Sequence, residues 1–385
     1  MTELNQRDIN WHGMKHAPTC LRDAETPFVL IDESRVQANV MRMAERVAQH
    51  GVKLRPHIKT HKMPFFAQMQ MEHGACGITV AKVSEAEVMA AGGIKDIFIA
   101  YPLVTSTKIN RAFELTKQAR IIIGVDSQEG ADLLEQLASE QELIVEVRIE
   151  VDTGLRRTGT KAATLLSLAS HLATYCPHLR LTGIYTFRGA MLNGEATLDL
   201  RAAGHDEGST MVRYANMLRD AGHAITDVSV GSSPTGLYAA EVPGVTEIRP
   251  GTYIFNDRMQ VAFGVATLRD CAASVIVTIV SCPQEDLIVI DGGSKAFATD
   301  VQPNSAPLYL EGFGHITGVP HAVLGRLSEE HGMIRVTPGH PFRVGDRIAI
   351  IPNHICSTMN LYDQTWIVGT QPARQLPISA RGHSW

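Results

Sequence analysis

The sequence predicts an α/β protein, namely a TIM-type (β/α)8 barrel followed by a smaller, mostly β domain. Between about residues 27 and 260, short β-branched runs alternate with amphipathic helical stretches every ~20–25 residues, which is typical of β/α units. After about residue 265 this helical period disappears, and short apolar runs are separated by Pro, Gly and Asp. A chain of 385 residues is also too long for one ordinary core.

The barrel region contains eight candidate strands, taken in chain order. They are Lys53–Thr60, Gly77–Val83, Asp96–Ala100, Arg120–Val125, Ile144–Val151, Leu181–Tyr185, Val228–Gly231 and Thr246–Ile248. Eight strands that alternate with helices favour a closed barrel, and an open doubly wound sheet is the alternative. No Gly-x-Gly-x-x-Gly follows an early strand, which argues against a dinucleotide-binding domain.

Helical stretches lie between these strands. Ser34–Gln49 has its apolar residues at helical spacing, and Ser84–Ala91 should begin with Ser84 as N-cap and Glu87 as the other half of a capping box. The later β-like runs are Ser274–Ser281, Leu287–Ile290, Gly332–Val336 and Arg347–Ile351. We therefore expect a barrel over residues 25–262 and a β-rich domain formed by residues 1–24 and 263–385.

Composition narrows the functional class. A hydrophobic content of 44% and a charged content of 19% are those of a soluble globular protein. The net charge of -5 and the lack of a nucleic-acid-binding motif argue against nucleic acid as a partner. The sequence contains no apolar run of about 18 residues, so no membrane span is expected. The first residues lack the apolar core of a secretion signal. Six widely spaced cysteines without a Cys-x-x-Cys fit a reducing, cytoplasmic location.

The segment Arg55-Pro-His-Ile-Lys-Thr-His-Lys62 ends the first barrel strand. In an extended strand, the basic and titratable groups at positions 53, 55, 57, 59 and 61 would share one face. In a packed interior, the positive charges on such a face would repel one another unless the face meets an anion or a cofactor that reacts with a lysine. Neighbouring cations and desolvation turn a lysine into a nucleophile, so Lys59 is a candidate Schiff-base lysine. The alternative is a basic strand end that pairs with acidic loops.

Two late loops carry small hydroxyl residues and glycines. Gly231-Ser-Ser-Pro-Thr-Gly236 and Arg249-Pro-Gly-Thr-Tyr253 each follow a strand, where exposed backbone N–H groups can bind a phosphate. Barrels commonly hold phosphate in such late loops, although both could be ordinary tight turns. Arg157 follows another strand and could bind a cofactor oxyanion or pair with Asp152.

His354 and Cys356 are two positions apart after an apolar run, so in extended backbone their side chains face the same way. An imidazole and a thiolate together favour zinc over magnesium or calcium, and two protein ligands would leave coordination positions open. A buried cysteine beside a hydrogen-bonded histidine is the structural alternative.

Taken together, these segments resemble the fold-type III pyridoxal-phosphate enzymes that include D-serine dehydratase, D-threo-3-hydroxyaspartate dehydratase and D-threonine aldolase, relatives of the alanine racemases. The resemblance runs from about residue 25 to the end of the sequence. It implies pyridoxal 5'-phosphate on Lys59, the catalytic residue, and a divalent metal on His354 and Cys356, with zinc favoured over manganese or cobalt. The cofactor-binding residues that it implies are Lys59, His57, Arg157, Tyr185, Ser233, Thr235, Gly236, Arg249, Gly251 and Thr252. Relatives also imply a homodimer.

Within this family, the His-x-Cys pair and the Ser-Ser-Pro-Thr-Gly loop resemble the dehydratases, whereas Asn360-Leu-Tyr-Asp363 is more similar to the aldolases. Asn193 stands where the aldolases carry a candidate catalytic histidine, and Phe187 and Arg188 also depart from the usual residues. We expect Arg188 and Asn193 to lie on the substrate side.

The predicted activity is a lyase reaction on a small β-hydroxy D-amino acid. Lys59 would take the Cα proton, Arg249 would donate to the pyridine nitrogen, and the metal would assist departure of the hydroxyl, giving a 2-keto acid and ammonia. The alternative is retro-aldol cleavage to glycine and an aldehyde. A racemase or a non-catalytic pyridoxal-phosphate-binding protein is a more remote alternative.

Overall fold

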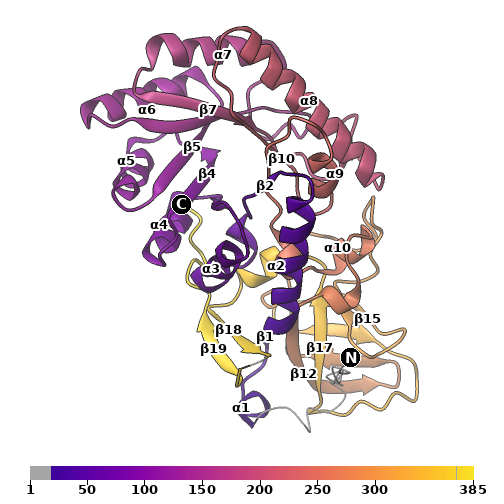
Figure 1. Cartoon of the computed structure of the whole chain (residues 1–385). Helices are drawn as coiled ribbons and strands as arrows, with labels where there is room; N and C mark the ends of the chain where they lie inside the picture. Colours follow the sequence, from indigo (N-terminus) through magenta and orange to yellow (C-terminus); the bar gives the residue numbers. More distant parts are fainter. Residues whose placement is uncertain (1–18, 370) are drawn as a thin grey trace, which may run out of the picture. The chain divides into compact units, whose positions relative to one another are not determined.

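The computed structural model describes residues 19–369 and 371–385, which divide into two compact units (Figure 1). One unit combines the chain up to Val36 with Phe255–Ile378. The other combines Gln37–Ile254 with Ser379–Trp385. In the described part of the chain, no helix is long and apolar enough to cross a membrane.

The unit that begins at Gln37 is built on a parallel sheet of eight strands, in the order β2-β11-β10-β7-β6-β5-β4-β3. The strands are β2 (Lys53–Leu54), β3 (Ile78–Val80), β4 (Asp96–Pro102), β5 (Arg120–Val125), β6 (Val145–Glu150), β7 (Leu179–Tyr185), β10 (Asp227–Val230) and β11 (Glu247–Ile248). Next to the end strands, His57 forms a parallel bridge with Thr79, whose N–H donates to the Pro56 carbonyl over 2.8 Å. The predicted TIM-type α/β architecture is confirmed.

Helices follow the strands in a β/α alternation. They are α2 (Glu33–Ala48), α3 (Pro64–Glu72), α4 (Val83–Ala91), α5 (Ser106–Glu114), α6 (Gln128–Glu140), α7 (Ala162–Tyr175), α8 (Leu200–Asp220) and α9 (Gly236–Ala240). Short 3₁₀ turns lie at Ile58–Thr60, Leu115–Lys117 and Thr252–Ile254, and a two-residue hairpin joins β8 (Met191–Leu192) to β9 (Glu195–Ala196). Some strands are continuous apolar runs, such as Ile121–Ile123 in β5, because side chains on both faces of the sheet are buried there.

The other unit is mostly β, as predicted, and its sheet has nine strands. They are β1 (Phe28–Asp32), β12 (Ala273–Gln284), β13 (Leu287–Ile290), β14 (Gly314–Ile316), β15 (Val323–Leu327), β16 (Gly332–Arg335), β17 (Arg347–Pro352), β18 (Gln364–Val368) and β19 (Arg374–Pro377). β1 lies between β12, with which it is antiparallel, and β18, with which it is parallel. Its short helices are α1 (Thr19–Arg22), α10 (Arg258–Ala262), α11 (Ile355–Met359) and a 3₁₀ turn at Leu268–Asp270.

The first barrel strand is shorter than predicted, and the expectation of one shared basic face is wrong. β2 ends at Leu54, and Ile58–Thr60 forms a 3₁₀ turn. Pro56 has no N–H for a strand ladder, and the His57 imidazole accepts the Lys59 N–H over 3.3 Å, which stabilises the turn. Arg55 is instead buried and ion-paired, with its Nε 2.7 Å from the Glu247 carboxylate.

The predicted capping box of α4 is also wrong. Lys82 is the N-cap and makes no side-chain cap hydrogen bond. The Ser84 hydroxyl donates to the Trp385 carbonyl over 2.7 Å, and Glu87 pairs with Arg111. The Trp385 carbonyl also accepts the Ser84 N–H of the first helical turn over 3.2 Å, and the Glu85 carboxylate accepts the Ala81 N–H before the helix over 2.7 Å.

Candidate active site

Lys59 and Arg157 contact the same aromatic ring. The Lys59 Nζ lies 5.2 Å from the centre of the Phe187 ring, and the Arg157 guanidinium carbon lies 5.3 Å from it. Lys59 is half-buried in the turn after β2, Arg157 is exposed after β6, and Phe187 follows β7. Two cations predicted from separate segments are therefore brought together around one side chain.

The pKa of His57 reflects its burial and the positive charges around it. Burial lowers the pKa of His57 well below its usual value, and the charges of Lys59, Arg249 and Arg157 lower it further. The imidazole is therefore neutral at neutral pH. A group of cations this close together favours an anionic ligand, which would offset their mutual repulsion.

Tyr185 and Arg249 lie next to each other in the interior of the barrel unit. The Tyr185 hydroxyl donates to the Glu150 carboxylate over 3.1 Å, and the Arg249 guanidinium carbon lies 5.3 Å from the Tyr185 ring. Burial raises the pKa of both Tyr185 and Glu150. Gly124 makes room for this hydroxyl, since a Cβ there would come within 2.2 Å of it.

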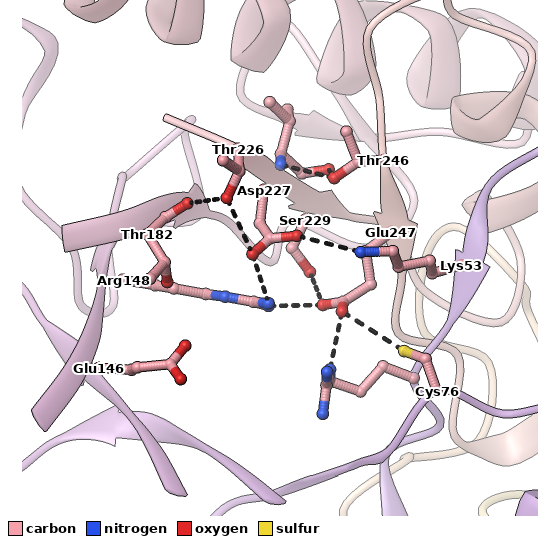
Figure 2. A network of polar contacts seen from close by, with 12 residues as sticks. Lys53, Cys76, Glu146, Arg148, Thr182, Thr226, Asp227, Ser229, Thr246 and Glu247 are labelled. Carbon is pink, nitrogen blue, oxygen red and sulfur yellow. Dashed lines mark hydrogen bonds and ion pairs between the residues drawn. The ribbon is translucent and has the colours of Figure 1, made fainter. Parts of the chain in front are cut away.

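A buried polar network fixes the direction of Arg249, and Figure 2 shows the part of this network around Ser229 and Glu247. Ser229 accepts from the Arg249 Nη1 over 2.5 Å and donates to the Glu247 carboxylate over 2.6 Å, while Arg249 also donates to the Thr186 carbonyl. Burial raises the pKa of Glu247, but the charges of Arg55 and Arg148 outweigh this and hold it well below its usual range. Since Glu247 stays ionised, it accepts the hydrogen bond of the Ser229 hydroxyl, and the Ser229 oxygen in turn accepts one from Arg249.

Sequence reasoning missed this network, although a signal was present. The buried strand β10 alternates Asp227, Val228, Ser229 and Val230, and β11 is followed directly by Arg249. Polar residues at every second position of an otherwise apolar strand indicate polar groups that face one another inside the sheet.

The two late loops are connected to each other. The Tyr253 N–H donates to the Ser233 hydroxyl over 3.1 Å. Within the first loop, the hydroxyls of Ser232 and Thr235 are 2.8 Å apart, and the Gly236 N–H donates to the Ser232 carbonyl over 2.8 Å. These contacts bring Ser233, Thr235 and Gly236 together with the second loop.

The second loop packs on the segment that contains Lys59. The His57 N–H donates to the Pro250 carbonyl over 3.0 Å. A Cβ at Gly251 would lie 2.9 Å from the His57 carbonyl and 3.1 Å from the Thr60 hydroxyl, so only glycine fits this approach. Thr252 begins the 3₁₀ turn that follows.

Glu207 of α8 is a further residue that the sequence did not indicate. Its carboxylate is fully buried and accepts the N–H groups of Gly231 and Arg188, each over 3.2 Å. Glu207 therefore joins the start of the first late loop to the chain after β7. A carboxylate on a helix gives no pattern of its own, so sequence alone could not have placed it.

The structure gives Arg188 and Asn193 contacts of a structural kind. The buried Arg188 guanidinium donates to the Asp206 carboxylate over 2.7 Å and to the Ala203 carbonyl over 2.9 Å. Asn193 is exposed in the β8–β9 turn, where its φ of 52° and that of 83° at Gly194 suit a two-residue hairpin. A substrate role for either residue remains a prediction.

His354 and Cys356 lie in the mostly β unit, where β17 is followed by α11. The His354 Nδ1 is 2.6 Å from the Asp300 carboxylate, and His354 and Cys356 are hydrogen-bonded to each other. Burial lowers the pKa of His354, but the charge of Cys356 and the hydrogen bond to Asp300 outweigh it and raise the pKa to about 11. Metal-binding histidines commonly bind a carboxylate through the nitrogen that is not a ligand, so the pair fits a divalent metal.

Asp300 and Asp257 support this pair, and neither was predicted. Ser357 also donates to Asp300, over 2.9 Å. The fully buried Asp257 accepts the Ile355 N–H over 3.0 Å, next to His354. Both carboxylates come from loops whose approach to the pair depends on the tertiary fold.

Comparisons with known proteins agree with this organisation. Residues 31–259 match the family model described as alanine racemase, N-terminal domain, and residues 272–368 match the putative serine dehydratase domain. The chain is 34% identical to a D-threo-3-hydroxyaspartate dehydratase of Delftia sp. (strain HT23), covering 87% of this chain and 91% of that protein. It is 28% identical to a D-threonine aldolase of Arthrobacter sp., covering 94% of each. A solved metal-free cysteine-to-alanine mutant of D-threo-3-hydroxyaspartate dehydratase superimposes with a TM-score of 0.85 at 30% identity, covering 95% of this chain and 99% of that one.

Proposed function

The chain belongs to the alanine racemase-like family that carries a serine dehydratase domain, and from this membership we propose a pyridoxal-phosphate- and metal-dependent lyase that dehydrates β-hydroxy D-amino acids. Its products would be a 2-keto acid and ammonia. The observation that carries the proposal is the meeting of Lys59 and Arg157 at Phe187, beside two hydroxyl-rich loops. The 34% identity to a D-threo-3-hydroxyaspartate dehydratase favours this substrate class.

The residues of the barrel unit fit pyridoxal phosphate. Lys59 supplies an amine, Arg157 and Arg249 supply fixed positive charge, and His57 is neutral. The loops that contain Ser233, Thr235, Gly236, Gly251 and Thr252 offer hydroxyl and N–H groups of the kind that hold a phosphate. When bound, the cofactor would supply an electron sink for the substrate Cα.

Protein groups would move and hold the protons. Lys59 would bind the cofactor through its Nζ, and its free amine would then take the proton from the substrate Cα. Arg249 would face the pyridine nitrogen as a hydrogen-bond donor that cannot readily release its own proton. Ser229 and Glu247 support this role, because they fix the orientation of the Arg249 guanidinium.

His354 and Cys356 would hold the divalent metal. The imidazole and thiolate donors favour zinc, and Asp300 orients the imidazole through its Nδ1. A bound metal would supply Lewis acidity toward the departing hydroxyl.

Retro-aldol cleavage is the second candidate function. The 28% identity to a D-threonine aldolase over 94% of both proteins favours it, as does the segment from Asn360 to Asp363. Both reactions use the same cofactor and metal, so the products must separate them. Incubation with a panel of β-hydroxy D-amino acids, with zinc or manganese added, should release ammonia and a 2-keto acid. Release of glycine and an aldehyde without ammonia would replace the dehydratase by an aldolase.

The role of Lys59 can be tested directly. Lys59→Ala should lose the visible absorbance of bound cofactor and reduce ammonia release by at least about 10²-fold, since the general base is lost. Lys53→Ala is the matched control, because Lys53 lies in β2, just before the same segment, and its side chain is 60% exposed. A dialysis-resistant cofactor band in Lys59→Ala would refute the assignment.

A further inference from the structure

A second group of metal-binding side chains lies on the outside of the barrel unit. Asp132 of α6, His171 of α7 and Cys176 directly after α7 place three donor atoms within 4.8 Å of one another. The His171 Nε2 is 2.6 Å from the Asp132 carboxylate. α6 and α7 are neighbouring helices, so the group joins two adjacent β/α units (Figure 1).

Burial increases from one side of this group to the other. The Asp132 side chain is 60% exposed, that of His171 is 17% exposed, and Cys176 is 1% exposed. Solvent therefore reaches the Asp132 carboxylate, while the Cys176 sulfur is buried on the inner side of the group. The carboxylate side is therefore the side from which an ion would reach this group.

A second ion pair holds the chain around Cys176 in place. Glu135, one turn after Asp132 on α6, accepts the His178 backbone N–H over 2.9 Å and contacts the His178 Nδ1 at 2.7 Å. This fixes the Cys176–His178 turn against α6. Two carboxylates beside one thiol also make the local potential negative, which favours a cation.

We propose that Asp132, His171 and Cys176 form a structural zinc site that links α6 to the end of α7. Nitrogen, sulfur and oxygen ligands together suit zinc better than magnesium or calcium, and a water molecule can fill the fourth position. A tetrahedral zinc with bonds of about 2.0–2.3 Å holds its ligand atoms ~3.3–3.8 Å apart. The donor atoms of this group lie within 4.8 Å of one another, with one pair at 2.6 Å, so their separations are close to this range. The site is separate from His354 and Cys356, which belong to the other unit.

A cobalt titration of the full-length protein tests this site. The double variant His354→Ala/Cys356→Ala removes the other predicted thiolate ligand. In this background, cobalt should still give a thiolate-to-metal charge-transfer band that saturates at one equivalent, and zinc should abolish it. Adding Cys176→Ala should remove the band, whereas Cys282→Ala, which changes an exposed cysteine, should leave it. Absence of the band from the double variant, or its survival in Cys176→Ala, would overturn the proposal.

Asp132→Ala gives a measurement that does not depend on the buried cysteine. Because the Asp132 side chain is largely exposed, its removal leaves the core unchanged. In the otherwise unchanged protein, zinc content after dialysis should fall by one ion per chain, or zinc affinity should weaken at least tenfold. Unchanged zinc content and affinity in Asp132→Ala would contradict the site.

Discussion

Glu207 is a buried acid whose protonation should affect folding. Burial raises its pKa to about 7, although the charges of Arg188 and Arg249 and two backbone N–H groups act in the opposite direction. The folded protein therefore binds this proton more tightly than the unfolded chain does. Its contribution to the free energy of unfolding is largest at low pH and is lost as the pH rises from about 4.5 to about 7.

Glu207→Gln should remove this pH dependence. Between these two pH values, the unfolding free energy of the parent protein minus that of Glu207→Gln should fall by about 3 kcal/mol, at ~1.4 kcal/mol per pH unit. Urea denaturation at a series of pH values measures the difference. Glu195→Gln, which changes an exposed carboxylate in β9, controls for the loss of one charge. A difference that grows as the pH rises would show that the assigned direction is wrong.

Helix α4 contributes the carboxylates of two ion pairs that differ greatly in burial. The Lys62 Nζ is 3.1 Å from the Glu85 carboxylate, and their side chains are only 9% and 2% exposed. Two residues later, Glu87 pairs with Arg111, with exposures of 36% and 30%. The same helix thus offers a buried carboxylate and a partly exposed one for direct comparison.

Glu85→Ala should cost about 3–5 kcal/mol of unfolding free energy, because the buried Lys62 ammonium would lose its anionic partner. Glu87→Ala should cost about 0–1 kcal/mol, as expected for a solvated pair. Denaturant unfolding followed by circular dichroism measures both values. Equal costs would mean that Lys62 finds another partner when Glu85 is removed.

The first barrel strand shows where prediction from periodicity stops. The existence of this strand could be predicted from the sequence, but the period-2 pattern made it too long. Pro56 lacks the N–H that a strand ladder needs, and the His57 side chain stabilises a 3₁₀ turn by a hydrogen bond that periodicity does not reveal. The Lys59 assignment does not depend on the length of this strand, since it rested on a resemblance of motifs, and it stays a prediction. The same applies to α4, where a Ser-x-x-Glu pattern matched a capping box although the true contacts of Ser84 come from the distant Trp385.

At the scale of the whole molecule, the order of elements was predictable and the partners of the site residues were not. The change from helical to β periodicity correctly indicated a barrel followed by a β-rich part. The contacts of Asp300 with His354, and of Glu207 with Gly231, join residues that are far apart in the chain. Such contacts depend on tertiary packing, and no local pattern in the sequence records them.

The division into two units leads to a final prediction. Lys59 and the other proposed cofactor-binding residues belong to one unit, whereas His354 and Cys356 belong to the other. Cys356→Ala should therefore keep the visible absorbance of bound cofactor while ammonia release falls by at least about tenfold, and zinc should not restore it. Chelation of the parent protein should give the same loss, which added zinc should reverse. Cys282→Ala is the matched control. Full turnover after chelation would remove the metal from the reaction, and loss of the cofactor band in Cys356→Ala would show that the two units do not act separately.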